Sequence, residues 1–101
     1  MNKNTEDQFQ ILRRIQKKPQ TSQRELAAEL GFSLGKLNYC INALVDKGLI
    51  KINNFKKNKN KAKTIKYIIT PRGISERTKL TINFMKKKMR EYDELKHELT
   101  E

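Results

Sequence analysis

Hydrophobic positions between residues 22 and 50 recur at steps of three and four, the spacing of helices that bury one face. The recurring residues are Leu26, Ala27, Leu30, Leu37, Ile41 and Leu44. Ser22 and Ser33 stand where a hydroxyl group can cap each helix, and Ser22 with Glu25 forms a capping box. Gly31 supplies the left-handed residue that ends the first helix, and Gly48 follows the second. Two short helices joined by so short a turn predict a helix-turn-helix.

A helix is also predicted before this pair. Phe9, Leu12 and Ile15 form a helical stripe over roughly residues 6–17, where Thr5 can begin a capping box. Pro19 prevents the helix from continuing. The first three predicted elements are therefore all helical.

After the helix-turn-helix, the periodicity changes to that of strands. Residues 50–53 and 64–69 alternate or cluster apolar residues over short runs, which predicts two antiparallel strands. The connection at 56–63 is polar and rich in lysine, so it should lie on the surface. A hairpin in this position, after a helix-turn-helix, predicts the wing of a winged helix.

From Thr70-Pro71 onward the chain carries one more helical signal, of about 30 residues and about 45 Å. Gly73 weakens this helix near its start. Six positions follow alternating steps of three and four, as in a coiled-coil seam, with Leu95 beside them. The seam positions are Ile82, Met85, Met89, Tyr92, Lys96 and Leu99.

The seam predicts a homodimer formed through the C-terminal helix. The alternative is that this helix folds back on its own domain, with Ile74, Leu80 and Phe84 as contacts, and both arrangements can coexist along one helix. The predicted fold class is mainly α with a small β-hairpin. It divides into a winged helix-turn-helix at residues 1–73 and a C-terminal dimerisation helix at 74–101.

Charge identifies the class of partner. The formal net charge is +12, and residues 47–75 contain nine Lys or Arg and no Asp or Glu. This concentration of positive charge predicts a polyanion as the partner. The single cysteine, the lack of a long apolar run and the lack of a signal peptide predict a cytoplasmic protein without a membrane segment.

Two stretches carry a family resemblance: residues 44–50 (Leu-Val-Asp-Lys-Gly-Leu-Ile) and, after the hairpin, residues 67–73 (Tyr-Ile-Ile-Thr-Pro-Arg-Gly). Over roughly residues 6–75 the chain resembles the MarR-type winged-helix transcriptional regulators. Its short, lysine-rich form is most similar to a subgroup associated with exopolysaccharide gene clusters. The resemblance implies a dimer that binds double-stranded DNA and regulates transcription.

The chain departs from that family in two ways. Typical members have a longer helical dimer region, and their wing usually carries an Asp-x-Arg pattern where this chain has Asn and Lys. The resemblance therefore leaves open whether a small-molecule effector binds.

The second helix of the helix-turn-helix is the candidate recognition helix. If its apolar residues point inward, Gly35, Asn38, Tyr39 and Asn42 lie on the opposite face. An asparagine amide can pair with adenine N6 and N7, and Gly35 allows close backbone approach. The helix carries no arginine, so adenine–thymine steps and DNA shape are favoured over guanine. The alternative is that the asparagines only solvate an exposed face.

Contacts to phosphate are predicted from three regions: the starts of the two helices, the wing and the start of the last helix. The residues are Thr21, Ser22, Gln23, Arg24, Ser33, Lys36, Tyr39, Lys56, Lys57, Lys59, Lys61, Lys63 and Arg72. The wing lysines could instead only solvate a loop. For Arg72, an ion pair with Glu76 is an equal alternative.

Catalysis has little support. Cys40 lies beside the apolar stripe and has no nearby histidine, and His97 lies among acidic residues near the end of the chain. Neither an enzyme nor a cofactor or metal site is predicted. Two alternative functions are a protein-interaction module and an RNA-binding module, each with a coiled-coil tail. The basic wing disfavours the first, and the lack of paired surface aromatics disfavours the second.

Overall fold

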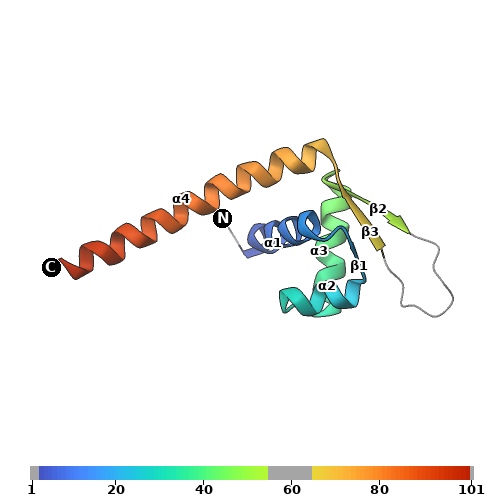
Figure 1. Cartoon of the computed structure of the whole chain (residues 1–101), viewed down its shortest axis with the longest axis horizontal. Coiled ribbons are helices and arrows are strands. Elements are labelled where there is room, and N and C mark those ends of the chain that lie inside the picture. The colour runs from blue at the N-terminus through green and yellow to red at the C-terminus, as the bar shows by residue number, and fades with distance from the viewer. Residues whose placement is uncertain (1–2, 55–64, 101) are drawn as a thin grey trace.

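A computed structural model describes residues 3–54 and 65–100 of the chain. Figure 1 shows α1, α2 and α3 gathered beside a small sheet, with α4 extending away from them. The fold class predicted from the sequence, a winged helix-turn-helix followed by a long helix, is confirmed. The elements are α1 (Lys3–Lys17), β1 (Gln20–Thr21), α2 (Gln23–Leu30), α3 (Leu34–Asp46), β2 (Ile50–Asn54), β3 (Ile65–Ile69) and α4 (Pro71–Leu99).

The first helix is longer than predicted. α1 already includes Lys3, so Thr5 lies inside the helix and the capping box predicted there is wrong. No proline or glycine precedes Thr5 to stop the helix, and Glu6 in its first turn complements the positive end of the helix dipole. The end at Lys17 is as predicted, two residues before the proline.

The helix-turn-helix has the predicted caps. The Ser22 hydroxyl accepts a hydrogen bond from the Glu25 amide at 3.0 Å, and the Ser33 hydroxyl accepts one from the Lys36 amide at 3.1 Å. Gly31 closes α2 with a φ of 72°. These local bonds satisfy amide groups that have no partner within the helix, which fixes where α2 and α3 begin.

The carboxylate of Glu25 has a different role from the one a capping box gives it. It accepts a hydrogen bond from Lys18 at 2.9 Å and one from Thr21 Oγ1 at 3.3 Å. The Lys18 hydrogen bond and positive charge lower the pKa of Glu25. The side chain therefore ties α2 to the segment that leads into it.

The sheet has one strand more than predicted. Its order is β1-β3-β2, all antiparallel, with Thr21 opposite Ile65 in one pair and Ile52 opposite Tyr67 in the other. The amide of Tyr67 also donates to the carbonyl of Pro19 at 2.9 Å. The segment between α1 and α2 is thus hydrogen-bonded to the hairpin, which orients α2 against the sheet.

A single core joins these elements, and α4 enters it through Leu80. The apolar stripes predicted for α1, α2 and α3 point into it. The buried hydrophobic residues are Phe9, Ile11, Leu12, Ile15, Leu26, Ala27, Leu37, Cys40, Ile41, Leu44, Leu49, Ile50, Tyr67 and Leu80.

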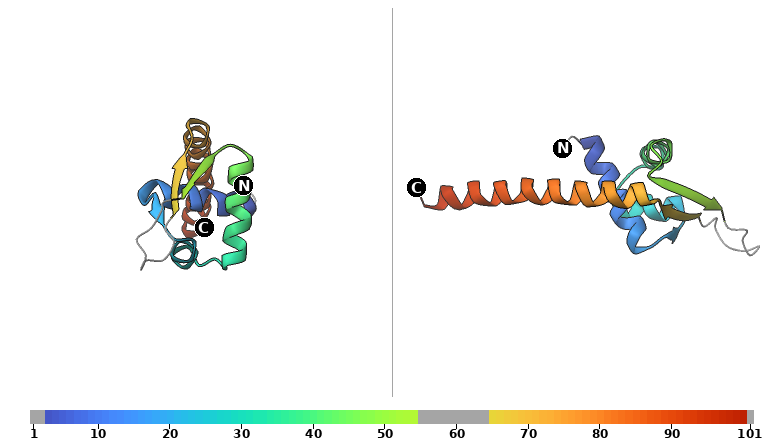
Figure 2. Two further views of the ribbon diagram at one scale, coloured as in Figure 1. Left: turned by 90° about the vertical axis from the view of Figure 1, so that its right-hand side faces the viewer. Right: turned by 90° about the horizontal axis from the view of Figure 1, so that it is seen from above.

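The N-terminal half of α4, as far as Phe84, docks on the domain and the rest projects from it (Figures 1 and 2). Leu80 is buried, and the Phe84 ring centre lies 5.6 Å from that of Phe9. Ile74 is 48% exposed, so its predicted docking role is wrong. From residue 88 to 100 every side chain is exposed. Within the described residues, α4 and the shorter helices lack the length and apolarity needed to cross a membrane.

Gly73 is required by the packing and does not merely weaken the helix. A Cβ atom at this position would collide with the carbonyl oxygen of Leu49 and lie 2.8 Å from Ile69 Cγ2. Thr70 caps α4 beside it, accepting from the Gly73 amide at 3.0 Å and donating to the Gly48 carbonyl at 2.7 Å. The start of α4 is therefore held against the turn that ends α3.

This close approach predicts that Gly73→Ala lowers the free energy of unfolding by at least about 2 kcal/mol, because backbone must move to admit the methyl group. The measurement is urea unfolding at fixed protomer concentration. Gly35→Ala is the matched control: its Cβ would meet nothing within 4 Å, so stability should be unchanged or rise by up to about 1 kcal/mol. Equal losses in both variants would contradict the close packing at Gly73.

Candidate nucleic-acid interface

The exposed face of α3 is the one expected from its periodicity. Leu37, Ile41 and Leu44 are each at most 1% exposed, whereas Tyr39 is 66% exposed. The remaining residues of the outward face are also exposed, and they are Gly35, Asn38 and Asn42. Two asparagines one helical turn apart therefore stand on a surface that the core of the domain holds rigidly.

Lys36 is less available than predicted. Its Nζ lies 3.1 Å from Asp7 Oδ2 and 4.3 Å from the centre of the Phe32 ring. The ammonium group thus connects the first turn of α3 to α1. A phosphate contact by Lys36 would first require this ion pair to break.

The other end of α3 is also tied to α1. Lys47, directly after the helix, donates a hydrogen bond from Nζ to Gln8 Oε1 at 2.9 Å, and Gln8 is only 5% exposed. Sequence reasoning missed both residues. The one available signal is that Gln8 stands four residues before Leu12, on the same apolar stripe of α1.

The residues predicted to contact phosphate at the start of α2 differ in their exposure. Thr21 is 3% exposed and its hydroxyl lies 3.3 Å from the Ser22 carbonyl oxygen and from Glu25 Oε2. Because pairing in β1 turns this side chain inward, Thr21 is not available to a phosphate. Ser22 and Gln23 are half-buried, and Arg24 is exposed.

The predicted wing contacts lie outside the described residues; they are Lys56, Lys57, Lys59, Lys61 and Lys63. On the described part of the hairpin, Lys51 and Asn53 are exposed. Arg72 is exposed at the start of α4, where it lines a hollow of about 280 Å³ together with Glu76. The hairpin and the start of α4 thus add polar and basic groups beyond those on α2 and α3.

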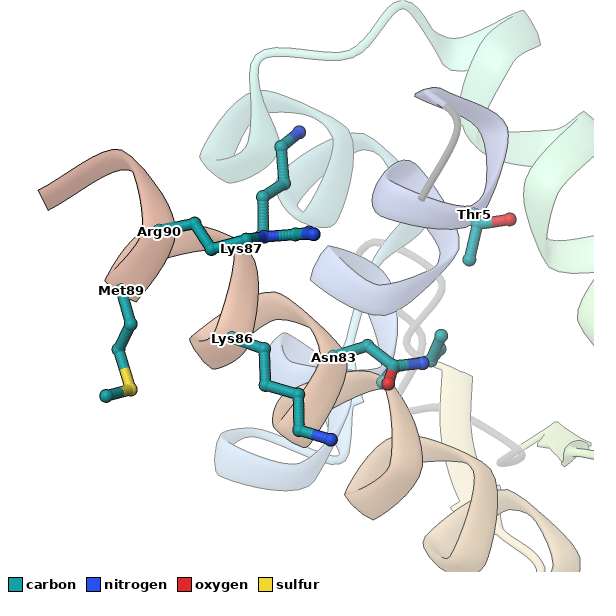
Figure 3. Close-up of a pocket in the computed structure, with 7 residues that line it drawn as sticks. Thr5, Asn83, Lys86, Lys87, Met89 and Arg90 are labelled. Atoms are coloured by element: carbon teal, nitrogen blue, oxygen red, sulfur yellow. The ribbon is translucent and has the colours of Figure 1, made fainter. Parts of the chain in front are cut away.

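A larger hollow, of about 610 Å³, lies between the start of α1 and the middle of α4 (Figure 3). Figure 3 shows Arg90 extending toward α1 and Met89 pointing away from it. The lining contains three cationic side chains and no acidic one. It consists of Thr5, Leu80, Asn83, Lys86, Lys87, Met89 and Arg90.

Comparison with known proteins identifies the fold. Residues 8–51 match the family described as winged helix-turn-helix DNA-binding, and no curated protein sequence matches the chain. The PcaV transcriptional regulator of Streptomyces coelicolor superposes with a TM-score of 0.65 at 15% identity, covering 78% of this chain and 54% of that one.

Two MarR proteins superpose equally well. The zinc-responsive MarR family member ZitR of Lactococcus lactis gives a TM-score of 0.66 at 18% identity, over 88% of this chain and 58% of that one. Staphylococcus aureus MarR, in complex with salicylate and kanamycin, gives 0.64 at 23% identity, over 86% and 56%. The chain thus spans little more than half the length of these structures.

The described residues therefore have a winged helix-turn-helix fold, and residues 8–51 match a family described as DNA-binding. The chain has the fold of the MarR-type regulators among these structures, as its sequence resemblance indicated. The narrower similarity to an exopolysaccharide-associated subgroup stays a prediction.

The packing of α3 also predicts a protected thiol. Cys40 is 1% exposed, and burial, followed by the Asp7 charge, raises the pKa of its thiol. In the native protein at pH 8, Cys40 should react with a charged aromatic disulfide reagent at least about 100-fold more slowly than in the unfolded chain. The release of the coloured thiol measures both rates. Similar rates would show that this side of α3 is not packed as described.

Proposed function

We propose that the chain is a transcriptional regulator that binds double-stranded DNA sequence-specifically as a dimer. The observation that carries this proposal is the outward face of α3, which is polar and exposed while its opposite face is buried. In helix-turn-helix proteins the second helix lies in the major groove. One solved neighbour, a variant of Lactococcus lactis ZitR, is a complex with DNA, and it superposes with a TM-score of 0.62 at 18% identity.

We infer that Asn38 and Asn42 recognise the bases. Each side-chain amide offers both a donor and an acceptor, which matches the N6 and N7 groups of adenine in the major groove. Gly35 has no Cβ, and the space beside it is open to 4 Å, so the backbone at the start of α3 can approach DNA closely. We infer a site rich in adenine–thymine pairs.

Affinity comes from phosphate contacts around this face. Ser33 and Tyr39 are exposed at the cap and on the outer face of α3, and Arg24 is exposed in the first turn of α2, after Ser22 and Gln23. Arg72 and the five wing lysines would add further contacts. The described ion pairs bind the Glu25 and Glu29 carboxylates of α2 to Lys18 and Arg14 of the α1 side, which offsets negative charge on the helix-turn-helix.

The dimer is assigned to the projecting part of α4. Its large apolar side chains have little to cover them, with exposures of 47% to 87%. They are Ile82, Met85, Met89, Tyr92, Leu95 and Leu99. Burial of each stabilises association by roughly 1.5–3 kcal/mol before ordering costs. A second copy would bring a second α3 to the next half-site.

Selection of bound sequences from a pool of random DNA duplexes tests the proposal. We expect enrichment of an adenine–thymine-rich palindrome whose half-sites lie about one helical turn apart. The same selection with a structured RNA pool is the comparison. Absence of any enriched duplex, or stronger enrichment of RNA, would refute sequence-specific DNA binding.

Asn38→Ala and Asn42→Ala should each weaken binding to the enriched site by about 1–3 kcal/mol while changing binding to random duplex little. Fluorescence anisotropy on both duplexes measures the ratio. Asn83→Ala, the same change on α4, is the control and should leave both affinities unaltered. An equal loss on both duplexes would mean that the α3 asparagines position the protein without reading bases.

Binding should also depend steeply on salt. If each protomer neutralises about three to five phosphates, the log–log slope of affinity against salt should be about −5 to −9. Changing the five wing lysines to Gln should weaken binding to all duplexes and flatten this slope. A Lys3→Gln/Lys17→Gln variant on α1 should shift the slope by less than about one unit. A wild-type slope near zero would exclude the electrostatic contribution.

A further inference from the structure

We propose that the projecting part of α4 pairs with the same segment of a second copy in antiparallel orientation, about a two-fold axis between Arg90 and Glu91. This inference rests on the proposed dimer and specifies its orientation and register. The occupant of the exposed face of α4 is thus a reversed copy of α4 itself.

The seam positions of α4 are arranged symmetrically about the midpoint of the seam. Relative to the midpoint between residues 90 and 91, Met89 and Tyr92 are equally distant, as are Met85 and Lys96, and Ile82 and Leu99. An antiparallel pair in this register therefore places every seam residue opposite another seam residue. The exposures are 56% for Met85 and 63% for both Met89 and Tyr92, so these central positions are open to a second copy.

The charges reverse sign across the same midpoint. On the N-terminal side, residues 86–90 carry four Lys or Arg and no acid, whereas residues 91–94 carry three acids and no Lys or Arg. An antiparallel pair sets the basic block of each copy beside the acidic block of the other. A parallel pair sets each block beside its own copy, which is repulsive. Charge complementarity therefore selects the antiparallel arrangement.

Lys96 supports the same choice. In a parallel seam the two Lys96 ammonium groups would face each other between the helices. In the antiparallel register Lys96 lies opposite Met85 of the second copy, and the two lysines are about 16 Å apart along the axis. The apolar stem of the lysine can then pack on methionine while its charge remains in water.

The pairing face is separate from the face that α4 uses within its own domain. Leu80 and Phe84 dock on the domain, Phe84 against Phe9 of α1. At 100° per residue, Met85 lies about 100° and Met89 about 140° around the helix from Phe84, and both lie further from Leu80. Figure 3 shows Met89 directed away from α1. One helix can therefore contact its own core and a second copy at once.

The register also sets the separation of the two domains. The two Leu80 docking points would lie about 32 Å apart along the helix axis, and a shift of one heptad would change this by about 10 Å. The distance between the two domains therefore depends on the register.

A charge-reversal cycle tests the orientation. Lys86 directly follows the seam residue Met85, and Asp93 directly follows the seam residue Tyr92. In the antiparallel pair, Lys86 of each copy therefore lies beside Asp93 of the other copy. The dimer contains two such pairs. Lys86→Glu and Asp93→Lys should each raise the dimer dissociation constant about tenfold, and the double variant should restore it to within about threefold of wild type. Sedimentation equilibrium measures all four proteins. In a parallel pair Lys86 and Asp93 are not neighbours, so the double variant would not recover.

Cysteine cross-linking gives an independent readout in a Cys40→Ala background. Met85→Cys/Lys96→Cys should form interchain disulfides, and each single variant should not, because equivalent positions lie too far apart for a bond. Disulfide formation by either single cysteine variant would overturn the antiparallel register. So would a Lys86→Glu/Asp93→Lys variant whose dimer dissociation constant does not return toward that of wild type. A wild type that is monomeric at tens of micromolar would overturn the pairing itself.

DNA binding separates this inference from the proposed function. A dimer with the wrong orientation that still selects a palindrome refutes only the register. A dimer with the expected cross-links that selects no DNA refutes only the function. The reversal variants should keep non-specific duplex binding, because neither residue lies on α3.

Discussion

The contact between Gly73 and the carbonyl of Leu49 determines how the helix-turn-helix and α4 are joined. Leu49 immediately follows the turn at Gly48, whose φ of 73° lets the chain reverse from α3 into β2. Its carbonyl oxygen accepts from the Thr70 amide at 3.0 Å and lies where any Cβ at Gly73 would stand. The turn after α3 and the start of α4 are thus in van der Waals contact. The direction of α4 relative to α3 follows from this packing and not from a flexible linker.

The α1 helix fixes α3 at both ends through adjacent residues. Asp7 pairs with Lys36 in the first turn of α3, and Gln8 accepts from Lys47 just beyond its last turn. Buried apolar packing between these points gives affinity between the helices but little directional preference. The two polar contacts add direction, since a rotation of α3 about its axis would separate one or both pairs. The outward presentation of Asn38 and Asn42 therefore depends on α1 as much as on the helix-turn-helix itself.

The sequence predicted what local chemistry determines and missed what distant contacts determine. Ser22, Ser33 and Gly31 act within a turn of their position, so the ends of α2 and α3 could be placed. β1 has two residues, too few to show alternation, and it exists because β3 offers it partners far along the chain. The burial of Thr21 and the ion pair of Lys36 have the same origin. Gly73 was treated as a weak helix former because its neighbour, Leu49, is separated from it in sequence.

The projecting half of α4 is not stabilised by packing on a hydrophobic core. Residues 88–100 are all exposed, and a helix of about 12–15 residues is marginal in water by itself. An intrahelical ion pair there, Lys88 with Glu91 at 3.5 Å, adds only a few tenths of a kcal/mol. Association would supply the missing burial through Met85, Met89 and Tyr92. Helix formation in this segment and pairing of the two copies are then one coupled equilibrium. Dilution should therefore unfold the end of α4, while the residues up to Phe84 keep their fold.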